Sequence, residues 1–150
     1  MTETDADART EITALIHGYA ELLDTGDLDD VAALFADADY GTPNQGRIRG
    51  TETVRKVYEP VILYDDGTPR TKHVITNVTI TIEPDAMRAT AKSYFTVLQQ
   101  VEGSPLQPII AGRYHDRFEL VDGAWRFSER MILPDLIGDL SRHMRGGPLQ

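Results

Sequence analysis

Hydrophobic residues recur along the chain with two different periods. In residues 8–24 they follow the spacing of three and four that marks one face of an amphipathic helix, at Ile12, Leu15, Ile16, Tyr19, Leu22 and Leu23. Gly26 suits a left-handed end to this helix, and Asp27 suits the cap of a second, short helix that continues to Phe35. A third helical stripe begins at Thr51 and is expected to end near Pro60, because proline cannot continue a helix.

Beyond residue 70 the period changes to two, which predicts strands over residues 73–82, 88–100, 109–120 and 125–132. Asp122 and Gly123 predict a two-residue hairpin that pairs Leu120 with Trp125 and Phe118 with Phe127. By strict alternation Arg130 lies on the face opposite Trp125, and only a bulge would bring the two to one face.

Three helices followed by four antiparallel strands predict an α+β fold, with a helix layer packed on one curved, mainly antiparallel sheet. Residues 38–50 read as a loop that is compatible with a short strand over residues 38–40. The length of 150 residues favours one domain over residues 1–150, with loose tails at about residues 1–7 and 145–150.

Composition removes several classes of function. There is no cysteine, so disulfides, thiolate metal sites and cysteine nucleophiles are excluded. A net charge of −9 disfavours nucleic acid and anionic membrane surfaces as partners. No secretory signal or membrane-spanning stretch is visible, which favours a cytoplasmic location. No phosphate-binding glycine loop, zinc-protease motif or nucleophile elbow is present.

Chemistry must then come from histidine, aspartate, arginine and tyrosine. Asp24 lies in the last turn of the first helix, where a carboxylate opposes the helix dipole. His73 opens the first long strand on a mixed face that also carries Ile75 and Asn77, as a cavity wall would. Taken alone, each reads more simply as a solvent-facing residue, and His17 and His143 are also expected to face solvent. The hydroxyls of Tyr19, Tyr40 and Tyr114 would each need a partner if buried.

An aspartate closing the first helix, a T-x-H at residues 71–73 and the run GRYHDRFELVDGAWRFSER at residues 112–130 together resemble the SnoaL-like branch of the nuclear transport factor 2-like superfamily, over residues 8–135. The pattern is most similar to the scytalone dehydratase, hexachlorocyclohexane dehydrochlorinase and bile acid 7α-dehydratase group. The resemblance implies a cone-shaped α+β barrel and a His-Asp dyad, matched here by His73 and Asp24.

The same resemblance implies further site residues. Tyr19 matches a tyrosine of the bile acid dehydratases, and Arg130 matches an arginine shared by the dehydratase and dehydrochlorinase groups. Tyr40 matches a water- or substrate-binding tyrosine, and Tyr114 falls among pocket residues. The second strand histidine of scytalone dehydratase falls near Leu98 or Gln99 here, and Leu98 is taken as the pocket residue. The absence of that histidine argues against the substrate of scytalone dehydratase. Tyr19 stands where the dehydrochlorinase has a lysine, which argues against hexachlorocyclohexane as the substrate.

The resulting hypothesis is a cofactor-free, metal-free lyase or isomerase, in which His73 takes a proton from a small apolar cyclic substrate such as a polyketide, steroid or aromatic ring. The alternative is a non-catalytic binding or assembly module in which His73 and Asp24 only satisfy each other. The apolar outer face of the sheet also predicts a homo-oligomer, a trimer as in the resembled dehydratases or a dimer.

Overall fold

The computed structural model describes residues 4–146 and contains three helices and six strands. The elements in chain order are α1 (Asp5–Thr25), α2 (Leu28–Ala33), β1 (Asp39–Thr42), β2 (Gly46–Arg49), α3 (Thr51–Val57), β3 (Thr71–Ile82), β4 (Arg88–Gln99), β5 (Gln107–Val121) and β6 (Ala124–Ile137). The strands form one sheet in the order β2-β1-β6-β5-β4-β3, in which only the β1–β6 pair is parallel.

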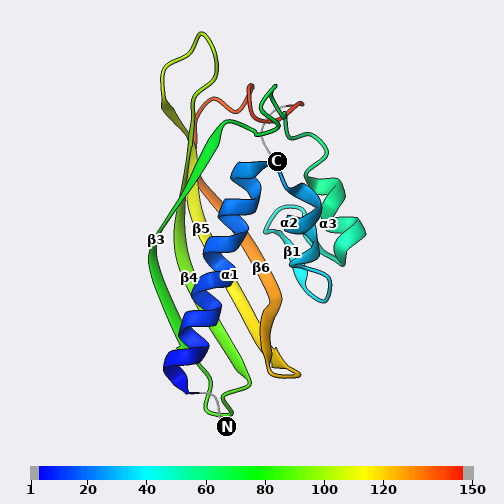
Figure 1. Cartoon of the computed structure of the whole chain (residues 1–150), viewed down its shortest axis with the longest axis vertical. Helices are drawn as coiled ribbons and strands as arrows, with labels where there is room; N and C mark the ends of the chain where they lie inside the picture. Colours follow the sequence, from blue (N-terminus) through cyan, green and yellow to red (C-terminus); the bar gives the residue numbers. More distant parts are fainter. Residues whose placement is uncertain (1–3, 147–150) are drawn as a thin grey trace.

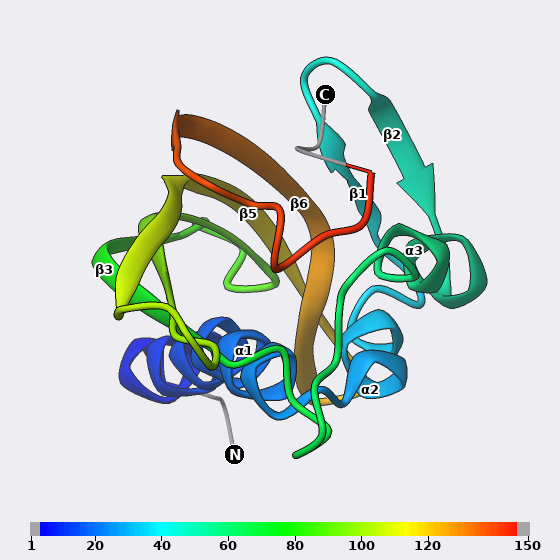
Figure 2. The same ribbon diagram turned by 90° about the horizontal axis from the view of Figure 1, so that it is seen from above.

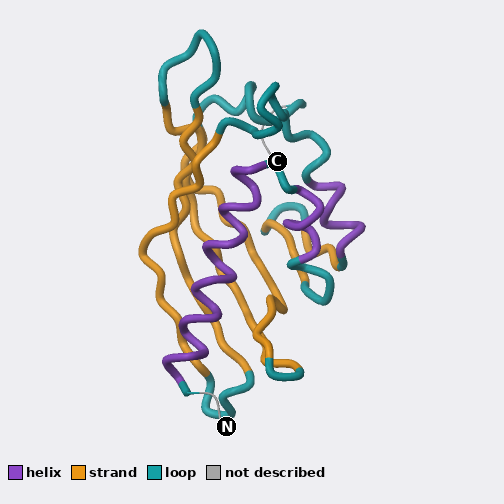
Figure 3. Tube along the Cα trace, in the orientation of Figure 1, coloured by secondary structure: helices purple, strands orange, loops and turns teal. Residues whose placement is uncertain are grey.

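The sheet curves around α1, which lies along its concave face, while α2 and α3 lie together beside β1 (Figures 1 and 2). Figure 3 shows how much of the strand length lies in the four long strands of the meander. The predicted α+β fold, with three helices on a curved and mainly antiparallel sheet, is confirmed. Within residues 4–146, no helix has both the length and the apolar character needed to cross a membrane.

The first helix begins earlier than its hydrophobic stripe predicts. Thr4 caps it by accepting a hydrogen bond from the backbone N–H of Asp7, whose carboxylate accepts in turn from the backbone N–H of Thr4. Residues 5–7, expected in a loose tail, therefore belong to α1. At the other end of the chain, the Arg145 N–H donates to the carbonyl of Pro60, so residue 145 is also anchored.

The passage expected to be mostly loop, residues 38–50, instead forms the β1–β2 hairpin at the edge of the sheet. Strand β1 pairs in parallel with β6 over Asp39–Gly41 and Glu129–Met131. Pro43 and Asn44, residues typical of loops, lie in the turn between two four-residue strands. This edge carries Tyr40 into the core.

Two bulges decide which side chains face inward. In β6, Phe127 pairs with Phe118 and Glu129 pairs with Arg117, so Ser128 is an extra residue. Arg130 is thereby turned to the face of Trp125 and Phe127, where it is fully buried. In β3 the register shifts between Thr76 and Thr79. The bulge at Ser128 is the irregularity that the sequence could not reveal, and it brings Arg130 to the same face as Trp125.

Candidate functional site

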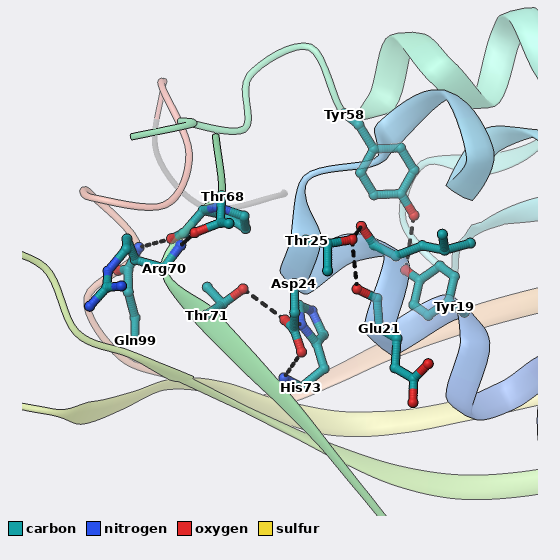
Figure 4. A network of polar contacts seen from close by, with 12 residues as sticks. Tyr19, Glu21, Asp24, Thr25, Tyr58, Thr68, Arg70, Thr71, His73 and Gln99 are labelled. Atoms are coloured by element: carbon teal, nitrogen blue, oxygen red, sulfur yellow. Dashed lines mark hydrogen bonds and ion pairs between the residues drawn. The ribbon is translucent and has the colours of Figure 1, made fainter. Parts of the chain in front are cut away.

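Asp24 and His73 meet where the end of α1 approaches the start of β3. Nδ1 of His73 lies 2.6 Å from Oδ1 of Asp24, and the backbone N–H of His73 donates to Oδ2 over 2.8 Å. The hydroxyl of Thr71 donates to Oδ1 over 2.9 Å. Figure 4 shows the carboxylate held between Thr71 and His73, and the two members of the pair are only 7% and 10% exposed.

This setting fixes the charge of Asp24. Burial by itself would raise the pKa of its carboxyl, but the hydrogen bonds and the charge of His73, together with the Thr71 hydroxyl, hold that pKa below its usual value. An ionised carboxylate against Nδ1 keeps the proton of a neutral imidazole on that nitrogen. Nε2 is then left with a free lone pair, and a lone pair is what a general base requires.

The ring of His73 lines a cavity of about 80 Å³ between α1, the sheet and the C-terminal segment. Its walls are mainly aliphatic and aromatic, formed by Tyr19, Leu23, Tyr40, Val57, Tyr58, Val61, His73, Phe95, Val97, Ile110, Tyr114, Ile132, Pro134, Leu140, His143 and Met144. Because an apolar wall excludes water, charges and hydrogen bonds inside the cavity are stronger than at the surface.

The hydroxyls of three cavity tyrosines form a hydrogen-bonded cluster with Tyr58 at its centre. The hydroxyl of Tyr58 lies 2.9 Å from that of Tyr19 and 2.5 Å from that of Tyr40. Burial raises the pKa of Tyr40 and Tyr58 well above the usual value, so both stay protonated at neutral pH. Three hydroxyls carry three protons but share two hydrogen bonds, so one proton remains available to another acceptor. This tyrosine cluster can therefore donate to an oxygen in the cavity.

Arg130, which the resemblance implies as a site residue, does not line the cavity. Its guanidinium forms a two-pronged ion pair with Asp116 at 2.8 Å, and both side chains are completely buried. It also stacks on the rings of Tyr19 and Tyr114, 4.3 and 3.9 Å from their centroids. Burial would lower the pKa of Arg130, but the charge and hydrogen bonds of Asp116 raise it. Arg130 therefore packs against the rings of Tyr19 and Tyr114 and helps to hold them in place.

Two other predicted pocket residues lie elsewhere. Asn77 is exposed and sits in the β3 bulge with a φ of 53°, so the inward alternation that starts at His73 breaks there. Leu98 follows Val97, a cavity residue, and adjacent strand residues point to opposite faces of a sheet. Neither residue lines the cavity, so both assignments are corrected. Tyr19, Tyr40 and Tyr114 do line it.

Two cavity residues could not be predicted from the sequence. The hydrophobic pattern places Tyr58 in the third helical stripe, but Tyr58 follows α3 and joins the tyrosine cluster. His143 was expected in solvent, but the C-terminal segment folds back and its ring lines the cavity. No local signal marks either residue, because both depend on chain segments that meet only in the folded state. His17 is exposed, as expected.

Residues 4–146 contain no group of three histidine, aspartate or glutamate side chains arranged to hold a metal ion. The polar groups around the cavity are imidazoles and phenols, which suit hydrogen bonding and proton transfer.

The model of the SnoaL-like domain family matches residues 4–131. A search of curated proteins found no match. A solved structure from Novosphingobium aromaticivorans, provisionally assigned as a scytalone dehydratase, gives a TM-score of 0.72 at 24% identity over 91% of this chain and 89% of that one. An NTF2-like protein with a cystatin-like fold from the same bacterium gives 0.68 at 19% identity, over 89% and 92% of the two chains. ActVI-ORFA from Streptomyces coelicolor gives 0.71 at 19% identity, over 85% and 97%. At these identities the likeness shows the fold.

Proposed function

The chain belongs to the SnoaL-like domain family, and on that premise we propose that it is a cofactor-free lyase or isomerase. One observation carries the proposal: the imidazole of His73 lines a largely apolar cavity while its Nδ1 lies 2.6 Å from the buried carboxylate of Asp24. A base oriented in this way, with its other nitrogen free, is the minimum equipment for removing a proton from carbon.

In the dehydration, Nε2 of His73 takes a proton from the carbon next to a carbonyl, and the electrons of the C–H bond move into an enolate. Asp24 stabilises the imidazolium that forms. The enolate then re-forms the carbonyl and expels the β-hydroxyl group, which takes the proton from the imidazolium and leaves as water. His73 is restored, and the product is the unsaturated carbonyl compound.

In the isomerisation of a β,γ-unsaturated ketone, the enolate is conjugated with the second double bond, the imidazolium returns the proton to the γ-carbon, and nothing leaves. Either reaction places negative charge on the carbonyl oxygen, so it gains from a preorganised donor. The tyrosine cluster has one hydroxyl proton to give, which makes Tyr19, Tyr40 and Tyr58 the proposed donors. Removing one such donor typically costs about 2.7–4 kcal/mol of transition-state stabilisation.

The substrate proposed is a small, largely apolar ring compound that carries a carbonyl. A cavity of about 80 Å³ is smaller than the roughly 150 Å³ that accepts benzene in an engineered protein, so a polyketide or steroid requires the walls to open. Figure 2 shows the C-terminal segment running from the end of β6 back toward α3. Leu140, His143 and Met144 bring it into the cavity wall, and its displacement would enlarge the cavity.

The name of one structural neighbour, the protein provisionally assigned as a scytalone dehydratase, agrees with the dehydration proposal. The small cavity favours the second candidate, a binding or assembly module in which the dyad is structural. An enzyme converts its ligand, whereas a binding module releases the ligand unchanged, so a turnover measurement distinguishes the two candidates.

The deciding experiment is a turnover screen of small β-hydroxy and β,γ-unsaturated cyclic ketones, with His73→Ala and Asp24→Asn beside the parent protein. We expect each variant to lose about 10²–10⁴-fold in rate, the usual contribution of general base catalysis. His17→Ala, which changes an exposed histidine of α1, is the matched control and should retain full activity.

If either dyad variant keeps the parent rate on a converted compound, the dyad has no part in the reaction. Saturable binding of the ketones without any conversion would instead support the binding module.

A further inference from the structure

His143 occupies a place that its position near the end of the sequence does not suggest. Its ring lines the same cavity as that of His73. The backbone around it is tied down, since its N–H donates to the carbonyl of Leu140 over 3.0 Å and its carbonyl accepts from the N–H of Ile62 over 2.9 Å. The bridge between Val61 and Met144 fixes the next residue. These backbone contacts therefore fix the position of the imidazole at the cavity.

The ring nitrogen Nδ1 of His143 is buried and has no hydrogen-bond partner among the described residues. Only two other side-chain atoms of residues 4–146 share that condition, Oγ of Ser93 and Nη1 of Arg130. A buried polar atom without a partner lowers stability, and a phenylalanine or leucine would close the wall without that penalty. A histidine at this position thus calls for a reason other than packing.

The charge of this imidazole differs from that of an exposed histidine. Burial, together with the charge of the nearby His73, lowers the pKa of His143 to about 4, although Asp24 acts in the opposite direction. At neutral pH the ring is therefore uncharged. It offers one N–H donor and one nitrogen lone pair, and both can bond to a hydroxyl group.

We infer that His143 is a substrate-binding residue, whose imidazole hydrogen-bonds an oxygen of the ring compound that His73 deprotonates. The inference rests on the proposed function for the identity of the substrate, although the binding itself does not require turnover. The match to the family model covers residues 4–131 and does not include His143. The ligand class is a small ring with a hydroxyl or carbonyl oxygen at the imidazole end of the cavity.

Phenol and toluene form a matched pair of probes, since they are similar in shape and only phenol carries a hydroxyl. We expect phenol to bind the full-length protein more tightly and to shift the ring-nitrogen NMR signals of His143, which toluene leaves in place. His17, exposed on α1, supplies the reference signal that neither probe moves. If saturating phenol leaves the His143 signals unchanged, or if phenol does not bind, the inference is wrong.

A pair of variants separates binding from structure. His143→Phe should keep or raise the melting temperature, because it removes the unpartnered nitrogen, and should weaken phenol about fivefold to tenfold relative to toluene. His143→Gln, which restores a donor and an acceptor, should recover part of that preference. A variant His143→Phe that is destabilised and keeps the preference for phenol would show a structural role only.

These outcomes are distinct from a failure of the proposed function. If no ketone is converted but the phenol preference depends on His143, the catalytic proposal falls and the binding residue stands. If ketones are converted through His73 and the phenol preference survives His143→Phe, the reverse is true.

Discussion

Replacing Asp24 by asparagine tests the centre of the site without any knowledge of the substrate. The carboxylate accepts three hydrogen bonds, from the Thr71 hydroxyl and from the backbone N–H and Nδ1 of His73. An amide offers one oxygen in place of two, so at least one of these donors must face its NH₂ group. A hydrogen bond to a charged group contributes about 1.5–3 kcal/mol. We therefore expect Asp24→Asn to lower the free energy of unfolding by about 1.5–3 kcal/mol at pH 7.

The pH dependence of that loss follows from the lowered pKa of Asp24. A carboxyl whose pKa is lower in the folded state than in the unfolded state stabilises the fold at pH values above about 3.9. This stabilisation is lost as the pH falls through the folded-state pKa. The difference between the parent and Asp24→Asn should therefore be full at pH 6–7 and should shrink as the pH falls below about 4.

Urea denaturation at pH 7 and at about pH 3 measures both quantities. Asp65→Asn is the matched control, because Asp65 is exposed and makes no hydrogen bond or ion pair with other described residues. Its loss should be near zero at both pH values. An Asp24→Asn variant as stable as the parent at pH 7, or equally destabilised at both pH values, would refute the view that an ionised Asp24 anchors the start of β3.

Three further predictions concern the surroundings of the site. Asp116→Asn should cost about 3–5 kcal/mol in urea denaturation, because it leaves the Arg130 guanidinium buried without its counter-charge, and adding Arg130→Met should recover most of the loss. Tyr58→Phe should cost about 1–3 kcal/mol and lower any ketone turnover, since two hydroxyls lose their shared partner, whereas Tyr94→Phe at an exposed position should change neither. Light scattering should show that the parent protein is an oligomer, either a trimer or a dimer. Leu136→Glu, which places a charge on the exposed apolar face of the sheet, should dissociate it. A monomeric parent would contradict the prediction.

The pairing of Asp24 with His73 could be anticipated although 49 residues separate them. The first helix ends near residue 25 and the first long strand begins near residue 71, and both limits are visible in the hydrophobic pattern. Neither residue is conspicuous alone, and the pairing was implied by the resemblance to the SnoaL-like branch rather than by the hydrophobic pattern.

The sequence alone did not predict correctly which strand side chains face the core and which face outward. Strict alternation assigns Arg130 to the outer face and Asn77 to the inner face, and a bulge reverses each assignment. Ser128, the extra residue of the β6 bulge, has no property that distinguishes it from an ordinary strand residue. The buried ion pair of Arg130 with Asp116 supplies a reason for the bulge that appears only in three dimensions.

Cavity residues supplied by loops were the least predictable. Tyr58 lies just after α3, and His143 lies in the segment beyond β6. His143 reaches the cavity when residues 60–62 pair with residues 143–145, and Tyr58 when the end of α3 meets Tyr19 and Tyr40. Neither long-range association has a periodic signal. The same association places the unpartnered nitrogen of His143 at the cavity, so the least predictable part of the chain carries the most specific proposal.

The last turn of α1 opposes the stability of its own helix. Its first turn carries Asp5 and Asp7, as the helix dipole favours, but its last turn has no basic residue and contains Asp24. A carboxylate at that end costs about 0.3–1 kcal/mol, and burying it adds a further cost. Thr71 and His73 offset these costs by donating to it, yet an apolar residue at position 24 would avoid them altogether. A local sequence choice that opposes stability, and that the fold then supports with three hydrogen bonds, is typical of a residue retained for its chemistry.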